Sequence, residues 1–266
     1  MFRRTDLDGF EVEAVSRNVA RVSYATSLMK KGVLISTTEH LLSAFVGMGI
    51  DNAIVELDNL ELPILDGSAH PFVDLIRRAG IRKQRRARSF LKVLRPLELR
   101  EGNKFIGLYP ADHYSVSYTI DFPHPLIGRE SRTLELTNGH YLAEIASART
   151  FGFLHEAEIM RQQGLIRGAS EDSVIVLTRD GLVNPPLRYP DEFVRHKILD
   201  LIGDLALIGR RILANVVADR AGHAMHTALV SRLLRDQASW EEVTLAEKDD
   251  HVNTLVEPEC PSVPLQ

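Results

Sequence analysis

The order of apolar and polar residues predicts helices and a strand in the first third of the chain. Apolar residues recur every three to four positions over 36–48, which is typical of an amphipathic helix. Its first residues, Ser36-Thr37-Thr38-Glu39, have the spacing of a capping box. An apolar run predicts a strand at 54–57, and Asp66-Gly67 predicts a turn. A second helix is expected at 71–79, where proline stands at an allowed early position.

The remaining two thirds of the chain alternate between strand-like and helix-like patterns. Short apolar or alternating runs predict strands at 90–99, 105–109, 115–122, 174–178 and 212–218. Helical spacing predicts helices at 139–147, 156–163, 191–208 and 223–237. Hairpin-like strands in series favour an α+β fold over a doubly wound parallel sheet.

A stretch of basic residues separates these two groups of elements. It contains Arg77, Arg78, Arg82, Lys83, Arg85, Arg86 and Arg88. A solvated linker explains such a run more simply than a binding patch. We therefore expect a first α+β lobe at 1–84 and a second at 85–246. The segment 247–266 is charged, rich in proline and without periodicity, so a loose tail is expected there.

Composition narrows the possible classes of protein. The 266 residues are 44% hydrophobic and 26% charged, which is ordinary for a folded soluble protein. A net charge of −4 argues against a nucleic-acid partner. The single cysteine, Cys260, excludes a disulfide scaffold and a cysteine-rich zinc site, and it suits a reducing compartment. No apolar run is long enough for a membrane span, and the first residues lack the apolar core of a signal peptide, so we expect a cytoplasmic protein.

The strongest chemical signal is on the helix predicted at 191–208. His196 and Asp200 are four residues apart, so their side chains share one face of that helix. An imidazole and a carboxylate in this arrangement can hold one metal ion, or they can form an ordinary surface pair. Asp204 continues the same face, either as a group that orients a histidine or as a solvated carboxylate.

Two further histidines are candidate functional residues only when they are considered together with this pair. His40 follows Glu39 at a predicted helix start, and His223 follows a glycine after a predicted strand. Each can be a surface residue, and Glu39 can simply cap its helix. Two histidines and one aspartate are nevertheless a plausible catalytic zinc set with a position open for water. Glu39 could then act as the base, and a donor to the oxyanion or the leaving group is also needed. The candidates for that donor are His223, Thr150 and Lys197.

Longer segments carry a resemblance to a known family. They are 35–42, 49–52, 65–69, 71–72, 121–122, 124–125, 148–153, 192–205 and 222–223. The strings ARTFGF at 148–153 and EFVRHKILDLIGD at 192–204 are highly specific. In these segments the sequence resembles the zinc-dependent UDP-3-O-acyl-N-acetylglucosamine deacetylases of lipid A biosynthesis. The segments stand in the family's order and spread over most of the chain.

The resemblance implies a role for each matching residue. The implied ligands of one Zn²⁺, or of another divalent ion, are His40, His196 and Asp200. The implied catalytic residues are the base Glu39, the protonated His223, its partner Asp204 and the oxyanion-binding Thr150. The implied substrate-binding residues are Lys197, Phe151, Lys104, Arg220, Phe122 and Ile166. The loop 164–168 resembles the wall of the passage for the acyl chain.

The resemblance also implies the fold and the reaction. The expected fold has two α+β lobes, each a mostly antiparallel sheet with paired helices, packed with the helices inward and the site between them. The expected reaction hydrolyses the acetamide of UDP-3-O-(3-hydroxyacyl)-N-acetylglucosamine to the free amine and acetate. No nucleic acid and no stable membrane span are expected. A monomer is favoured, although the resemblance does not determine the oligomeric state.

The sequence departs from the family pattern at three places. The family's opening strand pair, with its Gly-Leu-His stretch, does not precede Arg3, so we expect a first sheet with fewer strands and an exposed edge. Arg220 stands where lysine is usual, and Ala169 where a second glycine is common. Two alternatives follow: a folded but inactive zinc- or nucleotide-binding variant, and a zinc hydrolase for a different amide.

Overall fold

The computed structural model describes residues 1–155, 173–183 and 186–244. Its helices there are α1 (Glu39–Met48), α2 (His70–Ala79), α3 (Asn138–His140), α5 (Glu192–Leu205) and α6 (His223–Arg235). Its strands there are β1 (Phe2–Arg4), β2 (Phe10–Val12), β3 (Val19–Arg21), β4 (Ser27–Lys30), β5 (Val33–Ile35), β6 (Val55–Leu57), β7 (Ser89–Val93), β8 (Leu97–Glu101), β9 (Lys104–Pro110), β10 (Tyr114–Phe122), β11 (Gly128–Glu135), β12 (Phe151–Phe153), β13 (Ile175–Leu177), β14 (Arg211–Asp219) and β15 (Trp240–Thr244).

The N-terminal part contains two small sheets beside α1 and α2. In the described chain, β2-β1-β6 form one three-stranded sheet and β3-β4-β5 form another. β1 runs antiparallel to β2 and parallel to β6. The guanidinium of Arg3, in the central strand, bonds Glu11 at 2.9 Å and Glu56 at 3.0 Å across the two neighbours. These strands have only three or four residues, so they have little room to show an alternating pattern.

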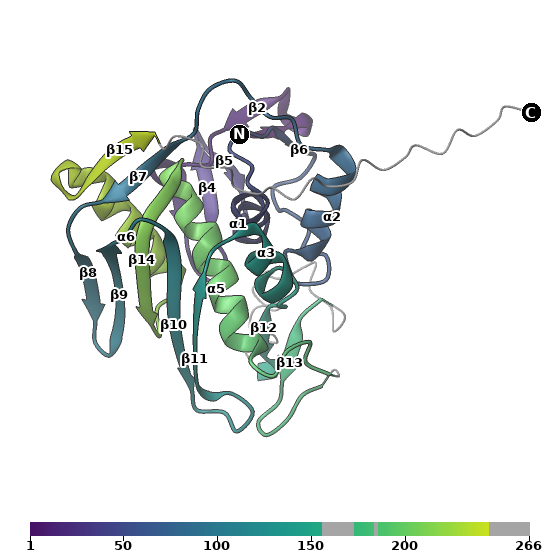
Figure 1. The fold of residues 1–266 in the computed structure, drawn as a ribbon. Coiled ribbons are helices and arrows are strands. Elements are labelled where there is room, and N and C mark those ends of the chain that lie inside the picture. Colours follow the sequence, from purple (N-terminus) through teal and green to yellow (C-terminus); the bar gives the residue numbers. More distant parts are fainter. Residues whose placement is uncertain (156–172, 184–185, 245–266) are drawn as a thin grey trace, which may run out of the picture.

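The C-terminal part is built on a larger mixed sheet. Within the described residues it has seven strands, in the order β11-β10-β14-β7-β15, with β9 also pairing with β14 and β8 with β9. Most pairings are antiparallel, while β14 runs parallel to β10 and to β7. The helices α5 and α6 cover one side of this sheet (Figure 1). The expected α+β class with mostly antiparallel sheets is therefore confirmed.

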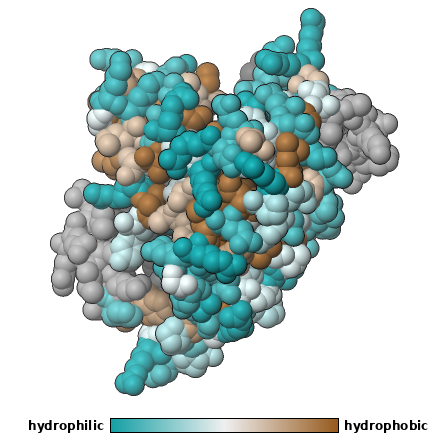
Figure 2. Space-filling view, turned by 90° about the vertical axis from the view of Figure 1, so that its left-hand side faces the viewer, coloured by the Kyte–Doolittle hydropathy of each residue, from teal (hydrophilic) through white to brown (hydrophobic). Residues whose placement is uncertain are grey.

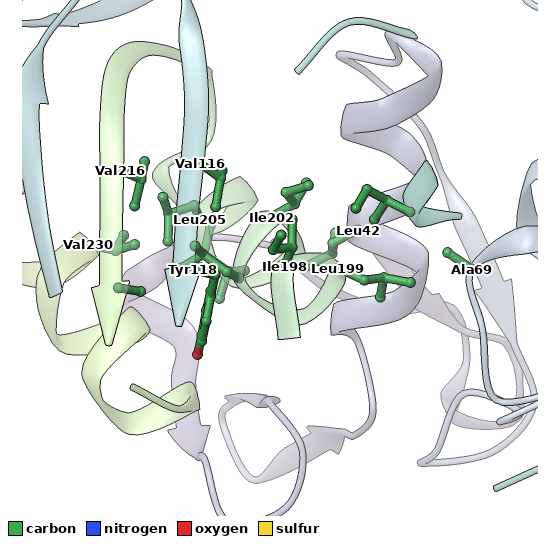
Figure 3. Packing of buried hydrophobic residues seen from close by; sticks show 14 of the residues in the cluster. Leu42, Ala69, Val116, Tyr118, Ile198, Leu199, Ile202, Leu205, Val216 and Val230 are labelled. Atoms are coloured by element: carbon green, nitrogen blue, oxygen red, sulfur yellow. The ribbon is translucent and has the colours of Figure 1, made fainter. Parts of the chain in front are cut away.

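One helix connects the two parts through the core. Figure 1 shows α5 running between the large sheet and α1. Of the 14 residues of α5, only Lys197 is not buried, so this helix is enclosed on nearly all sides. Figure 3 shows Tyr118 of β10 packing toward α5, and Leu199 of α5 lying on the side that faces Leu42 of α1. The apolar core therefore continues from the large sheet through α5 to α1.

The two helix backbones touch at a glycine. A Cβ atom at Gly203 of α5 would lie 2.0 Å from the carbonyl oxygen of Glu39 and 2.9 Å from its Cα atom. No side chain can occupy that space, because both obstructing atoms belong to backbone. Gly203 therefore permits α1 to begin directly against α5, and this contact sets the separation of the two helices at the candidate site.

The surface on the left-hand side of Figure 1 is mixed in character. Figure 2 shows apolar residues near the middle of this face among hydrophilic ones. Leu99 of β8 and Ala224 and Met225 of α6 line a hollow between these two elements. None of the helices in the described ranges is both long and apolar enough to cross a membrane.

Several predicted elements are confirmed with small shifts, and others differ. The predicted strand 90–99 is two strands, β7 and β8, because the chain is interrupted before Pro96, which has no N–H to donate. The predicted helix 139–147 is the short α3 followed by a π-helical turn at Tyr141–Ile145. The pattern did not reveal β1 to β5, β11, β12 or β15. The predicted helix 156–163 and the tail 247–266 lie outside the described residues.

The domain boundary at 84/85 stays a prediction. The basic stretch begins with Arg77 and Arg78 in the last turn of α2, continues as an irregular connection to β7, and is mostly exposed. Arg88 at its end bonds Asp51 at 2.9 Å and the Gly49 carbonyl oxygen at 3.0 Å. These contacts fit a solvated linker that is fixed at its C-terminal end.

We predict that Gly203→Ala destabilises the protein by about 1–3 kcal/mol, since the new methyl group forces two backbones apart. The measurement is the urea midpoint of unfolding. Gly139→Ala is the control, because the nearest atom to a Cβ there is 4.0 Å away. An unchanged midpoint for Gly203→Ala would show that the helices are not held at this distance.

Candidate metal centre

Three side chains with metal-binding atoms meet where α1 packs on α5. His40 lies in the first turn of α1, and His196 and Asp200 are one turn apart on α5. Their ligand atoms all lie within 4.8 Å of one another. Nε2 of His196 is 3.2 Å from Oδ1 of Asp200, and Nε2 of His40 is 3.7 Å from the same oxygen. All three side chains are buried, so the predicted ligands do form one enclosed cluster.

The spacing and chemistry of this cluster fit a divalent ion. Ligand atoms that surround an ion tetrahedrally at zinc-like distances are roughly 3.3 Å apart. Nδ1 of His196 is 3.0 Å from the carbonyl oxygen of Ala148, so Nδ1 carries the proton and Nε2 keeps its lone pair for an ion. Burial alone would raise the pKa of Asp200, but His196 and Lys197 hold it well below its usual range. Asp200 is therefore a carboxylate.

A buried ion pair joins the two most specific sequence segments. The Arg149 guanidinium bonds both carboxylate oxygens of Glu192, at 2.9 and 3.1 Å. The backbone N–H groups of Arg149 and Arg188 donate to the same carboxylate at 2.9 and 2.6 Å. Glu192 is the first residue of α5 and is completely buried. This pair holds the backbone around Ala148 against α5, where its carbonyl oxygen meets His196.

A second buried cluster lies one turn further along α5. Oδ2 of Asp204 accepts hydrogen bonds from Nδ1 of His223 at 2.7 Å and Nδ1 of His226 at 2.8 Å, while Oδ1 accepts from the Thr26 hydroxyl at 2.5 Å. Burial alone would lower the pKa of His223, but Asp204 raises it to about 9. His223 is thus a cation at neutral pH. Its Nε2 is 3.9 Å from Oδ2 of Asp200, beside the candidate metal centre.

Glu39 is buried next to His40, and its carboxylate bonds a segment outside its own helix. Its Oε2 accepts a hydrogen bond from the backbone N–H of Thr26 at 3.0 Å. The expected capping box is wrong, because α1 begins only at Glu39, no side chain caps it, and the Ser36 hydroxyl lies 3.0 Å from the Ser27 hydroxyl. Burial is the largest cause that raises the pKa of Glu39. Its carboxylate therefore binds a proton more strongly than an exposed glutamate does.

Three of the predicted substrate-binding residues lie together beside the cluster. Phe122 and Phe151 pack edge to face with ring centres 5.6 Å apart. Nζ of Lys197 is 5.5 Å from the Phe151 ring centre and bonds Asp200 at 2.8 Å. Thr150 precedes Phe151, and its backbone N–H donates to the Gly67 carbonyl oxygen at 2.8 Å. These residues form an aromatic surface next to the candidate metal centre.

The remaining predicted substrate-binding residues lie on other elements or outside the described residues. In the pairing of β9 with β14, Phe105 stands opposite Asp219. Lys104 comes one residue before Phe105 and Arg220 one residue after Asp219. Because the two strands are antiparallel, both residues lie at the same end of the sheet. Arg220 bonds Asp219 at 2.7 Å, and Lys104 is exposed. Ile166, Ala169 and the loop 164–168 lie outside the described residues.

Sequence reasoning missed two residues of the site. Thr26 bonds Glu39 through its backbone and Asp204 through its hydroxyl, and nothing in its sequence neighbourhood indicates either contact. His226 follows His223 by three residues on α6, a spacing that places both on one helix face. That spacing could have indicated from the sequence that His226 belongs to the site.

Fold and site together suit a metal-dependent hydrolase: a buried set of side chains that can bind a metal, a neighbouring carboxylate and a histidine whose pKa is raised. The family model LpxC, UDP-3-O-acyl N-acetylglycosamine deacetylase, matches residues 1–235, and the chain belongs to this family.

Curated relatives support this assignment over most of the chain. A protein of Solibacter usitatus is 54% identical over 245 residues, which cover 92% of this chain and 83% of the relative. One of Xylella fastidiosa is 46% identical over 92% of this chain and 82% of its own length. One of Saccharophagus degradans is 43% identical over 95% of this chain and 84% of its own length. Each is named UDP-3-O-acyl-N-acetylglucosamine deacetylase.

We predict that Arg149→Ala destabilises the protein by about 3–5 kcal/mol, because it leaves the buried Glu192 carboxylate without its charge partner. Chemical denaturation measures the loss. Arg77→Ala is the control: Arg77 is an exposed residue 3.8 Å from Asp74, and its removal should leave the midpoint unchanged. Equal effects of the two variants would contradict the structural role given to the buried pair.

Proposed function

We propose that this protein hydrolyses the acetamide of UDP-3-O-(3-hydroxyacyl)-N-acetylglucosamine to the free amine and acetate, the committed step of lipid A biosynthesis. The observation that carries the proposal is the buried meeting of His40, His196 and Asp200 beside Glu39 and His223. Such a set suits amide hydrolysis, and the names of the relatives supply the substrate.

We infer that the cofactor is one Zn²⁺ per chain, held by His40, His196 and Asp200. Two neutral imidazoles and one carboxylate are a typical catalytic zinc set, although other divalent ions can also occupy it. When bound, the ion would polarise the amide carbonyl and make water a stronger nucleophile at neutral pH.

The protein's own residues then accept and donate the protons of the reaction. The Glu39 carboxylate accepts a proton from the attacking water, and its raised pKa suits a base that works near neutral pH. The cation of His223 stabilises negative charge on the carbonyl oxygen and gives a proton to the amine nitrogen as the C–N bond breaks. Asp204 keeps His223 charged and oriented. The Thr150 hydroxyl is the further proposed donor to the oxyanion.

The substrate is bound on the surfaces next to this centre. Phe151 and Phe122 provide an aromatic wall, and Lys197 provides a positive charge between that wall and Asp200. Lys104 and Arg220 lie at one end of the large sheet, where two cations suit a nucleoside diphosphate. Ile166 is proposed to line the acyl passage. We propose a monomeric protein in the cytoplasm, where nucleotide sugars are substrates.

The test is acetate release from UDP-3-O-acyl-N-acetylglucosamine by the 266-residue chain, with metal content measured on the same sample. Acetate release that is lost with a chelator and regained with Zn²⁺ supports the proposal. Bound zinc without acetate release favours the inactive variant. Hydrolysis of other N-acetyl amides, but not of this substrate, favours a hydrolase with a different substrate.

We predict that Glu39→Ala keeps bound metal and loses about 10²–10⁴-fold in activity, as expected for loss of a general base. His196→Ala should lose the metal and the activity together. Metal analysis and acetate release, measured side by side, distinguish the two roles. His113→Ala, at an exposed histidine between β9 and β10, is the control and should match the unmodified protein. A metal-free Glu39→Ala protein would contradict the assignment.

A further inference from the structure

A fully buried histidine stands behind the His223–Asp204 pair, and the proposed reaction assigns it no role. The side chain of His226 has no exposed surface. Its Nδ1 is 2.8 Å from Oδ2 of Asp204, and its Nε2 is 3.1 Å from the hydroxyl of Tyr118. A buried polar ring with a partner at each nitrogen is held in one orientation.

The chemistry of the partners fixes where the ring carries its proton. Burial raises the pKa of Asp204, but His223 and its hydrogen bonds lower it below the usual range, so Asp204 accepts and cannot donate. Nδ1 of His226 must therefore be the donor in this contact. Burial lowers the pKa of His226, which keeps the imidazole neutral with its single proton on Nδ1. The positive charge of the cluster thus belongs to His223.

Tyr118 holds the opposite edge of the ring. Its side chain comes from β10, and Figure 3 shows the ring in the core with the hydroxyl oxygen at its far end. The hydroxyl has one proton for two neighbours, the Ala221 carbonyl oxygen at 2.7 Å and Nε2 of His226 at 3.1 Å. Nε2 carries no proton, so the hydroxyl holds this edge of His226 when it donates to Nε2, and the Ala221 carbonyl oxygen competes for the same proton.

The same groups do not have the spacing of a second metal site. The His223 and His226 Nδ1 atoms lie 2.7 and 2.8 Å from Oδ2 of Asp204, which are hydrogen-bond lengths. Ligand atoms around a tetrahedral ion are roughly 3.3 Å apart. Both nitrogens are used as donors to one oxygen, so these contacts are a hydrogen-bond network.

We propose that His226 is a positioning residue, whose Nδ1–H holds the Asp204 carboxylate in the orientation that His223 requires, and that Tyr118 in turn holds His226. The inference rests on the proposed function. Oδ1 of Asp204 is held by Thr26, and Oδ2 is held by both histidines. With its His226 contact removed, the carboxylate can turn away from His223, and the proton donor loses its alignment with the substrate.

Helix α6 supplies both histidines from its first turn. His223 and His226 are three residues apart, so they share a face, and the backbone N–H of His226 bonds the Gly222 carbonyl oxygen at 3.0 Å. The position of His226 is therefore set by the same helix start that presents His223. A defect at His226 should act on the reaction step rather than on substrate binding, because the aromatic and cationic surfaces lie on other elements.

The experiment compares two substitutions of His226, by asparagine and by glutamine, whose side-chain amides are equally polar. The amide nitrogen of asparagine is as many bonds from the backbone as Nδ1 of histidine, so His226→Asn can still donate to Asp204. Glutamine places its amide nitrogen near the position of Nε2, so His226→Gln can reach Tyr118 instead. We expect kcat of His226→Asn to stay within about three-fold of the unmodified protein. We expect kcat of His226→Gln to fall roughly ten-fold or more, with KM and bound metal unchanged.

Two further variants are measured, Tyr118→Phe as a second test and Leu229→Ala as a control. Tyr118→Phe removes only the hydroxyl and should lower kcat less than His226→Gln, again at constant KM. It tests the second part of the inference, the contact between Tyr118 and His226, and it can be measured even if His226→Gln does not fold: a lower kcat supports that part, and an unchanged kcat overturns it. Leu229 is fully buried one turn further along α6, so Leu229→Ala weakens that helix without touching Asp204 and should keep kcat.

The outcomes separate the inference from the proposed function. Equal kcat in His226→Asn and His226→Gln, or loss of metal in His226→Gln, overturns the positioning role. A fall of kcat in Leu229→Ala as large as in His226→Gln also overturns it, because general weakening of α6 would then explain both. Failure of the unmodified, metal-loaded protein to release acetate overturns the proposed function, and the inference with it.

Discussion

The site depends on one short distance between two helix backbones. Gly203 lets the first residue of α1 lie directly on α5, with space for no Cβ atom between them. Because His40 and Glu39 open α1, and Asp200 and Asp204 flank Gly203, this contact brings all four side chains into one buried volume. A wider separation would move the ligands of α1 away from those of α5 as a group. The glycine is thus as much a part of the site as the charged residues.

Much of the fold followed from periodicity, and the parts that did not follow have physical reasons. Long elements such as α5 and β14 contain enough residues for a pattern to repeat, and the bounds of both were predicted within a few residues. The strands β1 to β5 have three or four residues each, too few for alternation to stand out from chance. The prediction of one strand at 90–99 did not take Pro96 into account, although a residue without an N–H commonly interrupts a strand. Pairing between distant strands, which completes the sheets, has no local signal at all.

The site was predictable where its residues share a helix and unpredictable where distant segments meet. His196 and Asp200 are related by helical spacing. His40 was a weak candidate on its own that completed a set of two histidines and one aspartate, and the resemblance to a family then implied its role as a ligand. Thr26 bonds Asp204 across 178 positions of sequence, so no spacing rule could reveal it. Glu39 shows the opposite error: a local rule explained it as a helix cap, while its carboxylate bonds another segment. Local patterns therefore identified the helices of the site, and tertiary contacts decided what their side chains do.

The charges of the buried cluster explain why a metal ion suits it. Glu39, Asp200 and Asp204 are three buried carboxylate groups, and Lys197 and His223 are the cations that contact the aspartates. With all five ionised, the cluster has one negative charge in excess, and burying an uncompensated charge is costly. A divalent ion changes that excess to one positive charge. The centre would then attract the negative charge that develops on a carbonyl oxygen during amide hydrolysis. In the proposed reaction, Asp204 and His223 remain a paired unit that keeps its proton until the amine leaves.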